Sequence, residues 1–110
     1  MAIKLETQSN VRGGKGDVNF KYLLGDKELN GKNRLFAELT IKPGCSIGYH
    51  VHQGESETYY IISGTGKYDD NGTTRTVKPG DVTFTDSGCG HAIENAGSEN
   101  LVFMALIILA

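Results

Sequence analysis

Three histidines and one glutamate in this chain have a spacing that suits a single metal ion. His50 and His52 are two residues apart, and on a β-strand this spacing directs both imidazoles to one face. Glu57 follows after enough chain for a turn and the start of a returning strand, and His91 comes from far along the sequence. Imidazole nitrogen together with carboxylate oxygen suits borderline metals. We therefore expect one divalent transition metal, which is Fe, Mn, Ni, Co, Zn or Cu, bound by these four residues.

Length and charge narrow the class of protein. The chain has 110 residues and a formal net charge of −2, with no basic stripe. This length predicts one domain over 1–110 with a buried core, and the charge makes nucleic acid and anionic membranes poor partners. The amino terminus lacks the apolar core of a signal peptide, and the apolar run 101–110 is too short to span a bilayer. We expect a soluble, cytoplasmic protein.

The elements that position the four residues are predicted to be β-strands. Apolar residues come in short alternating or continuous runs that are separated by turn signals. The predicted strands are 18–24, 34–41, a strand carrying His50 and His52, 58–62, 66–69, 73–77, a strand carrying Val82 and Phe84, 91–95 and 101–109. Asn71-Gly72 predicts a hairpin, and 25–32 is expected to be a loop or hairpin connection. The absence of a long helical period favours a sandwich or barrel.

Two segments resemble the motifs of the cupin superfamily. The first, over 44–64, has glycine, five residues, His-x-His, four residues, glutamate, six residues and glycine, and every position matches: Gly44, His50, His52, Glu57 and Gly64. The second, over 80–95, has Gly80, Gly88, His91 and Asn95 in register. A separation of fifteen residues between the motifs is typical of compact single-domain cupins. Gly44 and Gly80 each follow a proline, where a type II turn requires positive φ.

This resemblance implies an all-β fold, the double-stranded β-helix or jelly-roll barrel of two antiparallel sheets. It also implies that His50, His52, Glu57 and His91 hold a metal inside the mouth of the barrel. Such a site keeps open positions for water, dioxygen or a chelating small molecule, unlike a closed structural site.

Two residues are candidates for a catalytic role beside the metal. Asp86 stands where the second motif has proline, so this loop is either looser, because proline would fix φ, or Asp86 reaches into the site. Tyr59 has the same strand parity as Glu57. Its hydroxyl is either a donor or proton relay near the metal, or part of an aromatic side chain that only lines the barrel.

Other polar features are assigned structural roles. Two cysteines, Cys45 and Cys89, are too few for a disulfide scaffold. There are three alternatives for Cys89: it approaches the metal, it pairs with Cys45 on oxidation, or it is a reduced structural thiol. The reduced thiol is favoured. Glu55 is expected to be solvated in the turn between ligand strands, and Asn95 to be a structural hydrogen-bonding residue. The segment 12–16 lacks the full phosphate-loop pattern and predicts a flexible loop.

The resemblance implies more than one function. The first hypothesis is a metal-dependent enzyme on a small oxygenated molecule, dioxygenase-like or with related C–C bond chemistry. The second is a non-catalytic module that binds a small molecule or sugar through the metal. Decarboxylase chemistry ranks lower, because the loop of Glu55 looks too short for a lid. Isomerase chemistry ranks lowest, because no pair of Arg or Lys residues is placed to clamp a phosphate.

The apolar C-terminal strand predicts a homodimer. Leu101, Phe103, Ala105 and Ile107 lie on one face, and Val102, Met104, Leu106 and Ile108 lie on the other. A small barrel on its own can bury one face of this strand against its core but does not always cover the other face. A symmetric dimer, formed by sheet packing or exchange of an edge strand, would cover the second face.

Overall fold

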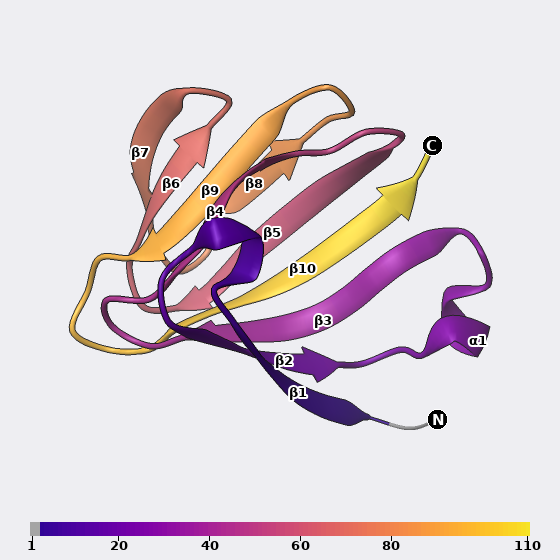
Figure 1. Cartoon of the computed structure of the whole chain (residues 1–110), viewed down its shortest axis with the longest axis horizontal. Coiled ribbons are helices and arrows are strands. Elements are labelled where there is room, and N and C mark those ends of the chain that lie inside the picture. The colour runs from indigo at the N-terminus through magenta and orange to yellow at the C-terminus, as the bar shows by residue number, and fades with distance from the viewer. Residues whose placement is uncertain (1–2) are drawn as a thin grey trace.

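Antiparallel strands form almost all of the regular structure in this computed structural model, which describes residues 3–110 (Figure 1). The elements in chain order are β1 (Lys4–Ser9), the 3₁₀ turn η1 (Val11–Gly13), β2 (Asp17–Tyr22), α1 (Asp26–Leu29), β3 (Asn33–Ile41), β4 (Ser46–Val51), β5 (Glu55–Ser63), β6 (Gly66–Asp70), β7 (Thr73–Val77), β8 (Val82–Thr85), β9 (Gly90–Asn95) and β10 (Leu101–Leu109).

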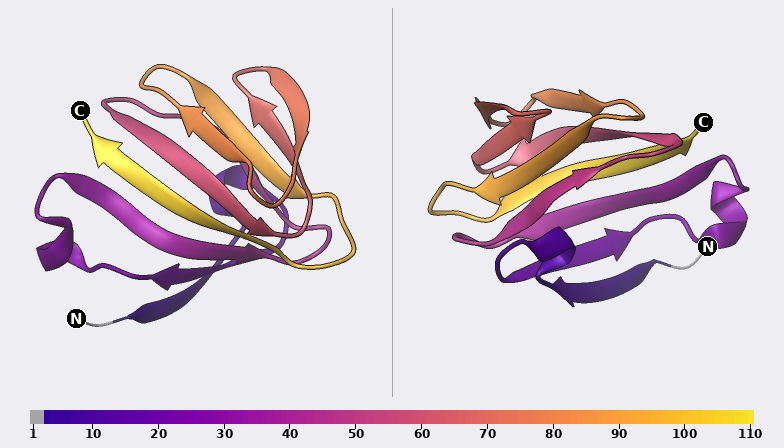
Figure 2. Two further views of the ribbon diagram at one scale, coloured as in Figure 1. Left: turned by 180° about the vertical axis from the view of Figure 1, so that it is seen from behind. Right: turned by 45° about the horizontal axis from the view of Figure 1, so that its top comes forward.

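These strands form two sheets. One has six strands in the order β1-β2-β3-β10-β5-β8, and the other has four in the order β4-β9-β6-β7. The views in Figure 2 show β9 and β6 lying over the sheet that contains β5 and β10. Because neighbouring strands such as β4 and β9 are far apart in sequence, residues from both cupin motifs meet in one sheet. The fold is the predicted double-stranded β-helix.

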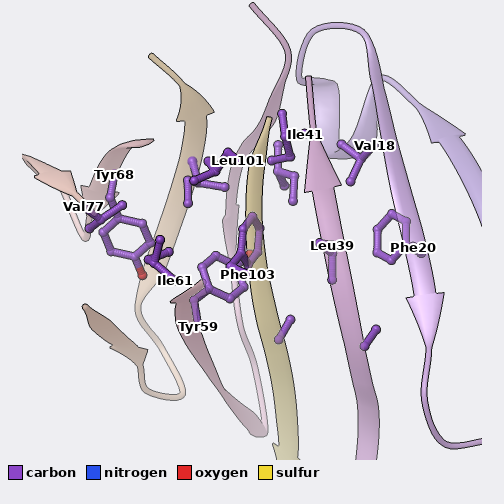
Figure 3. Packing of buried hydrophobic residues seen from close by; sticks show 14 residues of the cluster. Val18, Phe20, Leu39, Ile41, Tyr59, Ile61, Tyr68, Val77, Leu101 and Phe103 are labelled. Carbon is purple, nitrogen blue, oxygen red and sulfur yellow. The ribbon is translucent and has the colours of Figure 1, made fainter. Parts of the chain in front are cut away.

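An apolar core fills the space between the sheets (Figure 3). Successive side chains of a strand point to opposite faces, so β3 buries Ala37, Leu39 and Ile41, and Leu35 packs against the core on the same face. The residues between them point away from the core. β10 follows the same rule: Phe103 is fully buried and contacts the Tyr59 ring, with ring centroids 4.5 Å apart. The four-stranded sheet adds Tyr68 and other residues to the core. The alternation in 34–41 therefore predicted correctly which residues share one face of β3.

The predicted turns are present. Asn71 and Gly72 both have positive φ, 50° and 100°, as the primed hairpin turn between β6 and β7 requires. Gly44 has φ 80° and Gly80 has φ 91°, as predicted for a glycine after proline in these turns. The turns fix where β4 and β8 begin, and hence the register of the strands that follow.

Two elements differ from the sequence-based expectation. Segment 25–32, expected to be a loop or hairpin connection, contains the one-turn helix α1, because Glu28 Oε1 accepts a hydrogen bond of 3.0 Å from the Gly25 N–H and Leu29 is buried. β1 was not predicted, because its residues are mostly exposed and lack apolar alternation. It exists through backbone pairing with β2 at the sheet edge. No helix within 3–110 is long and apolar enough to cross a membrane.

Candidate metal centre

The structure brings the four predicted metal-binding residues together between the two sheets. His50 lies on β4 and is paired with His91 of β9, whereas Glu57 comes from β5 of the other sheet. His52 follows immediately after the end of β4. The four donor atoms all lie within 4.8 Å of one another. His52, Glu57 and His91 are at most 4% exposed, so most of this cluster lies in the interior of the protein.

The spacing of the donor atoms fits one metal ion. His91 Nε2 is 3.1 Å from both His50 Nε2 and His52 Nε2. Glu57 Oε1 is 3.0 Å from the Nε2 atoms of His52 and His91 and 4.0 Å from that of His50. Metal–donor bonds of about 2.1 Å that meet at a right angle place donor atoms about 3.0 Å apart. This cluster can therefore hold a divalent transition metal through three imidazoles and one carboxylate.

The electrostatics keep the carboxylate ionised. Burial acts to raise the pKa of Glu57, but the neighbouring imidazoles of His50, His52 and His91 outweigh burial and hold that pKa well below its ordinary value. Burial lowers the pKa of His91, and this favours the neutral imidazole. An anionic carboxylate and neutral imidazole are the forms that bind metal.

The first two histidines have their Nδ1 atoms held by acceptors that fix the ring orientation. His50 Nδ1 donates to the Gly48 carbonyl at 2.8 Å. His52 Nδ1 donates to Glu55 Oε2 at 2.6 Å, and both oxygens of Glu55 accept hydrogen bonds from Arg34, at 2.7 and 2.8 Å. These bonds leave each Nε2 with its lone pair directed to the cluster.

His91 is oriented by neutral hydroxyl groups instead. Its Nδ1 lies 2.8 Å from the Tyr68 hydroxyl and 2.9 Å from the Thr85 hydroxyl. The two hydroxyls are themselves 2.9 Å apart. All three residues are buried, so this network fixes the His91 ring without placing a further charge in the core.

A cavity of about 180 Å³ opens onto the donor cluster. His50, His52 and Glu57 contribute to its wall, together with Tyr59. The Tyr59 ring stacks on His91 with ring centroids 4.9 Å apart. Burial, reinforced by the negative charge of Glu57, raises the pKa of Tyr59 well above its ordinary value, so its hydroxyl keeps its proton. Tyr59 is therefore next to the cluster, on the same face of β5 as Glu57.

Other predicted residues lie elsewhere. Asp86 is exposed and does not line the cavity; its Oδ1 accepts a hydrogen bond of 2.8 Å from the Ser87 N–H. Cys45 and Cys89 are both free thiols, and neither belongs to the donor cluster. The structural role of Asn95 is confirmed, since its Nδ2 donates to the Ile41 and Glu99 carbonyls, each at 2.8 Å.

Several residues around the cluster were not predicted from the sequence. Glu55 was expected to be solvated, which is wrong: its side chain is 12% exposed and bridges His52 to Arg34. Arg34 and Arg12 both line the cavity, although neither was singled out as a candidate. Tyr68 is an aromatic residue of the core and lies outside both cupin motifs, so neither motif pointed to it. The only local signal was the spacing of Glu55, three residues after His52, a separation that a turn can close.

Known proteins share this fold and much of this sequence. The chain is 51% identical over 104 residues to a Thermotoga maritima protein named oxalate-binding protein, which covers 94% of this chain and 86% of that protein. A crystal structure from Thermotoga maritima, described as a predicted oxalate decarboxylase, superposes with a TM-score of 0.94 at 47% identity and covers all of both chains.

A more distant relative is a larger enzyme. Oxalate decarboxylase OxdC of Bacillus subtilis is 33% identical over 75 residues, which are 64% of this chain and 20% of that enzyme. The chain thus spans about one fifth of that relative's length. The model of the cupin domain family matches residues 37–108, which include both motifs and all four clustered donors. The chain therefore belongs to the cupin family.

Proposed function

We propose that this protein binds a small carboxylate, with oxalate as the leading candidate, through a divalent metal held by the four clustered residues. The observation that carries the proposal is the convergence of three imidazoles and one carboxylate beside a cavity of about 180 Å³, whose wall includes His50, His52 and Glu57. A cavity of this size suits a ligand of a few heavy atoms. When bound, the metal supplies Lewis-acid attraction for carboxylate oxygens.

The relatives support oxalate as the ligand. The protein named oxalate-binding protein shares 51% identity over nearly the whole of this chain. The dioxygenase chemistry that ranked first from sequence has no comparable support, since no observed residue favours it. It stays a prediction and becomes one outcome of the test below.

Within this proposal, Tyr59 is the hydrogen-bond donor toward the bound carboxylate. Its side chain lines the cavity beside Glu57 and stacks on His91. The raised pKa, caused by burial and then by Glu57, keeps the phenol protonated near neutral pH. A protonated phenol in a buried wall can donate to an anionic ligand, and such a bond is stronger than one between neutral groups.

Calorimetry with oxalate tests the proposal. The protein is stripped with a chelator, reloaded with Mn(II), Fe(II), Ni(II), Co(II), Zn(II) or Cu(II), and titrated with sodium oxalate. We expect one metal per chain and oxalate binding only in a metal-loaded form. Equal oxalate affinity in the stripped protein, or no binding with any of these metals, would contradict the proposal.

The fate of the ligand separates binding from catalysis. Oxalate recovered unchanged identifies a binding protein, whereas formate and carbon dioxide identify a decarboxylase. Oxygen consumption with flavonols, diketones or catechols, in the absence of oxalate binding, would replace the present proposal with the dioxygenase hypothesis. The same metal-loaded samples serve all three measurements, so metal content is held constant between them.

The homodimer predicted from sequence also remains a proposal, now with a defined surface. Tyr60, Ile62, Val82 and Phe84 on the outer face of the six-stranded sheet are each between 43% and 56% exposed. Tyr60 is paired with Val82 on β8 and with Met104 on β10, so these side chains form one continuous apolar patch. A second copy of the chain would cover such a patch by symmetric packing.

Sedimentation equilibrium tests the dimer. We expect the wild-type protein to be a dimer and Phe84→Asp to be a monomer, because the new charge would be buried in the contact. Thr74→Asp, on the exposed strand β7 of the other sheet, is the matched control and should leave the dimer intact. A monomeric wild-type protein would refute this proposal.

A further inference from the structure

We infer that Arg12 recognises the outward-facing carboxylate of a small dianionic ligand in this cavity, and this inference rests on the carboxylate-binding function proposed above. Three charged side chains other than histidine line the cavity: Arg12, Arg34 and Glu57. Glu57 faces the donor cluster. Within residues 3–110, no lysine lines the cavity, and the two arginines supply its guanidinium groups. The surroundings of the two arginines differ.

The charge of Arg34 is already neutralised. Its guanidinium donates two parallel hydrogen bonds to the carboxylate of Glu55, which is the strong forked geometry of such pairs. Arg12, by contrast, forms no ion pair and no side-chain hydrogen bond in the described part of the chain, and it is exposed at the cavity. Arg12 is therefore the lining guanidinium whose donors remain available to a ligand.

The backbone at Arg12 is in a conformation that its residue type does not favour. Among residues 3–110, four non-glycine residues have positive φ, and the other three are asparagine. Asparagine tolerates this left-handed region, whereas other side chains incur strain there. Arg12 has φ 54° and ψ 34°. Strain of this kind is kept where the surrounding structure imposes it, and it is concentrated at ligand-binding positions.

The strand that carries His50 imposes this conformation. The turn η1 packs against β4, as Figure 1 shows at the indigo segment after β1. Two glycines allow the backbones to touch: a Cβ at Gly48 would lie 2.1 Å from the Arg12 carbonyl oxygen, and a Cβ at Gly14 would lie 2.3 Å from the Ser46 carbonyl oxygen. Arg12 is thus held in a fixed relation to β4, and hence to the donor cluster.

Arg12 shares the cavity wall with the donor cluster. The same cavity is lined by Arg12, by Tyr59 and by His50, His52 and Glu57 of the cluster. An anion that lies between the cluster and Arg12 would be attracted from both sides, because a divalent metal and a guanidinium both carry positive charge.

This arrangement favours the binding of a dianion over that of a monoanion. A dianion such as oxalate can bind the metal through some of its oxygens and accept hydrogen bonds from the Arg12 guanidinium with others. A monoanion such as formate satisfies the metal and leaves Arg12 without a partner. Arg12 is accordingly a specificity residue for short dicarboxylates, and it does not bind the metal.

Calorimetric titration of Mn(II)-loaded variants with oxalate and with formate tests the assignment. Arg12→Gln should weaken oxalate binding by about 10- to 100-fold, as expected for loss of a charged hydrogen bond, and should leave formate binding and Mn(II) affinity within about twofold. Lys15→Gln removes the same charge from the same loop at a residue that does not line this cavity, so it should change oxalate affinity by less than about twofold.

Gly14→Ala tests the positioning by β4. Its Cβ would displace η1 from Ser46 without altering any cavity side chain, so oxalate affinity should fall while Mn(II) affinity is kept. If wild-type protein fails to bind oxalate, the proposed function fails and this inference with it. If wild-type protein binds oxalate but Arg12→Gln matches Lys15→Gln, or weakens formate equally, only the role of Arg12 is overturned.

Discussion

His52 and His91 direct their Nε2 atoms to one centre, yet the chain orients the two rings by different chemistry. His52 is held by the carboxylate of Glu55, which is paired with Arg34. His91 is held by the hydroxyls of Tyr68 and Thr85. The first support is ionic and reaches the molecular surface, where the Arg34 side chain is 47% exposed. The second is neutral and lies within the core.

Depth in the barrel accounts for this difference. An ionised group in an apolar interior is costly unless it is paired and hydrogen-bonded, and the core beside His91 already contains the Glu57 carboxylate. Hydroxyls orient the ring there without a further charge. Near the cavity mouth, solvent and Arg34 both stabilise the carboxylate of Glu55, whose pKa is lowered chiefly by the hydrogen bond from Arg34. A carboxylate therefore orients the imidazole near the solvent, and neutral hydroxyls orient the imidazole in the core, where a further charge would be costly.

Removing a shared donor should have the largest effect, because it abolishes the centre that both supports serve. We expect His91→Ala to reduce metal content from one equivalent to nearly none, a greater loss than the about 10- to 100-fold typical of outer partners. Elemental analysis of protein purified without added metal measures this. Arg75→Ala, on the exposed strand β7, is the control, and near-complete metal retention in His91→Ala would refute the four-donor site.

Weakening the ionic support should have the next largest effect. Glu55→Gln replaces the charged acceptor of His52 Nδ1 with a neutral one and leaves Arg34 unpaired, so we expect metal affinity to fall about 10- to 100-fold in a chelator competition. Arg34→Gln keeps the direct bond to His52 and should cost less. Equal affinities in Glu55→Gln and wild-type protein would show that the ionic support does not tune the site.

Weakening the neutral support should affect stability more than metal binding. Tyr68→Phe removes one hydroxyl beside His91 Nδ1 but keeps the Thr85 hydroxyl and the buried ring. We expect the free energy of unfolding of the metal-free protein to fall by about 1 kcal/mol, as measured in urea. Metal affinity should fall less than in Glu55→Gln. A larger loss of metal affinity than in Glu55→Gln would reverse the ranking of the two supports.

The smallest effect is expected at Asp86, which belongs to neither support. Its exposed carboxylate accepts a hydrogen bond from the Ser87 N–H, so Asp86→Ala should change the free energy of unfolding by at most about 0.5 kcal/mol and leave metal and oxalate affinities unchanged. Thermal unfolding and calorimetry measure both. A marked loss of oxalate affinity or turnover would instead favour the catalytic role that the departure from the motif suggested.

Local rules account for what could be predicted from the sequence. The His50–His52 spacing, the glycines after Pro43 and Pro79, and the alternation in 34–41 each depend on a few neighbouring residues, whose geometry a strand or turn dictates. The fold class followed from the two motifs. β1 had no such signal, because its pairing with β2 depends on backbone hydrogen bonds that any sequence of suitable conformation can form.

The sequence by itself thus determined the strands other than β1, the turns and the four residues that converge between the sheets. Only the tertiary structure decided what surrounds them: that Glu55 faces Arg34, that Tyr68 reaches His91 across paired strands β6 and β9, and that Arg12 lies at the cavity. Such contacts depend on which strands become neighbours and on how closely backbones approach. Both are set by packing over the whole barrel, which no short window of sequence contains.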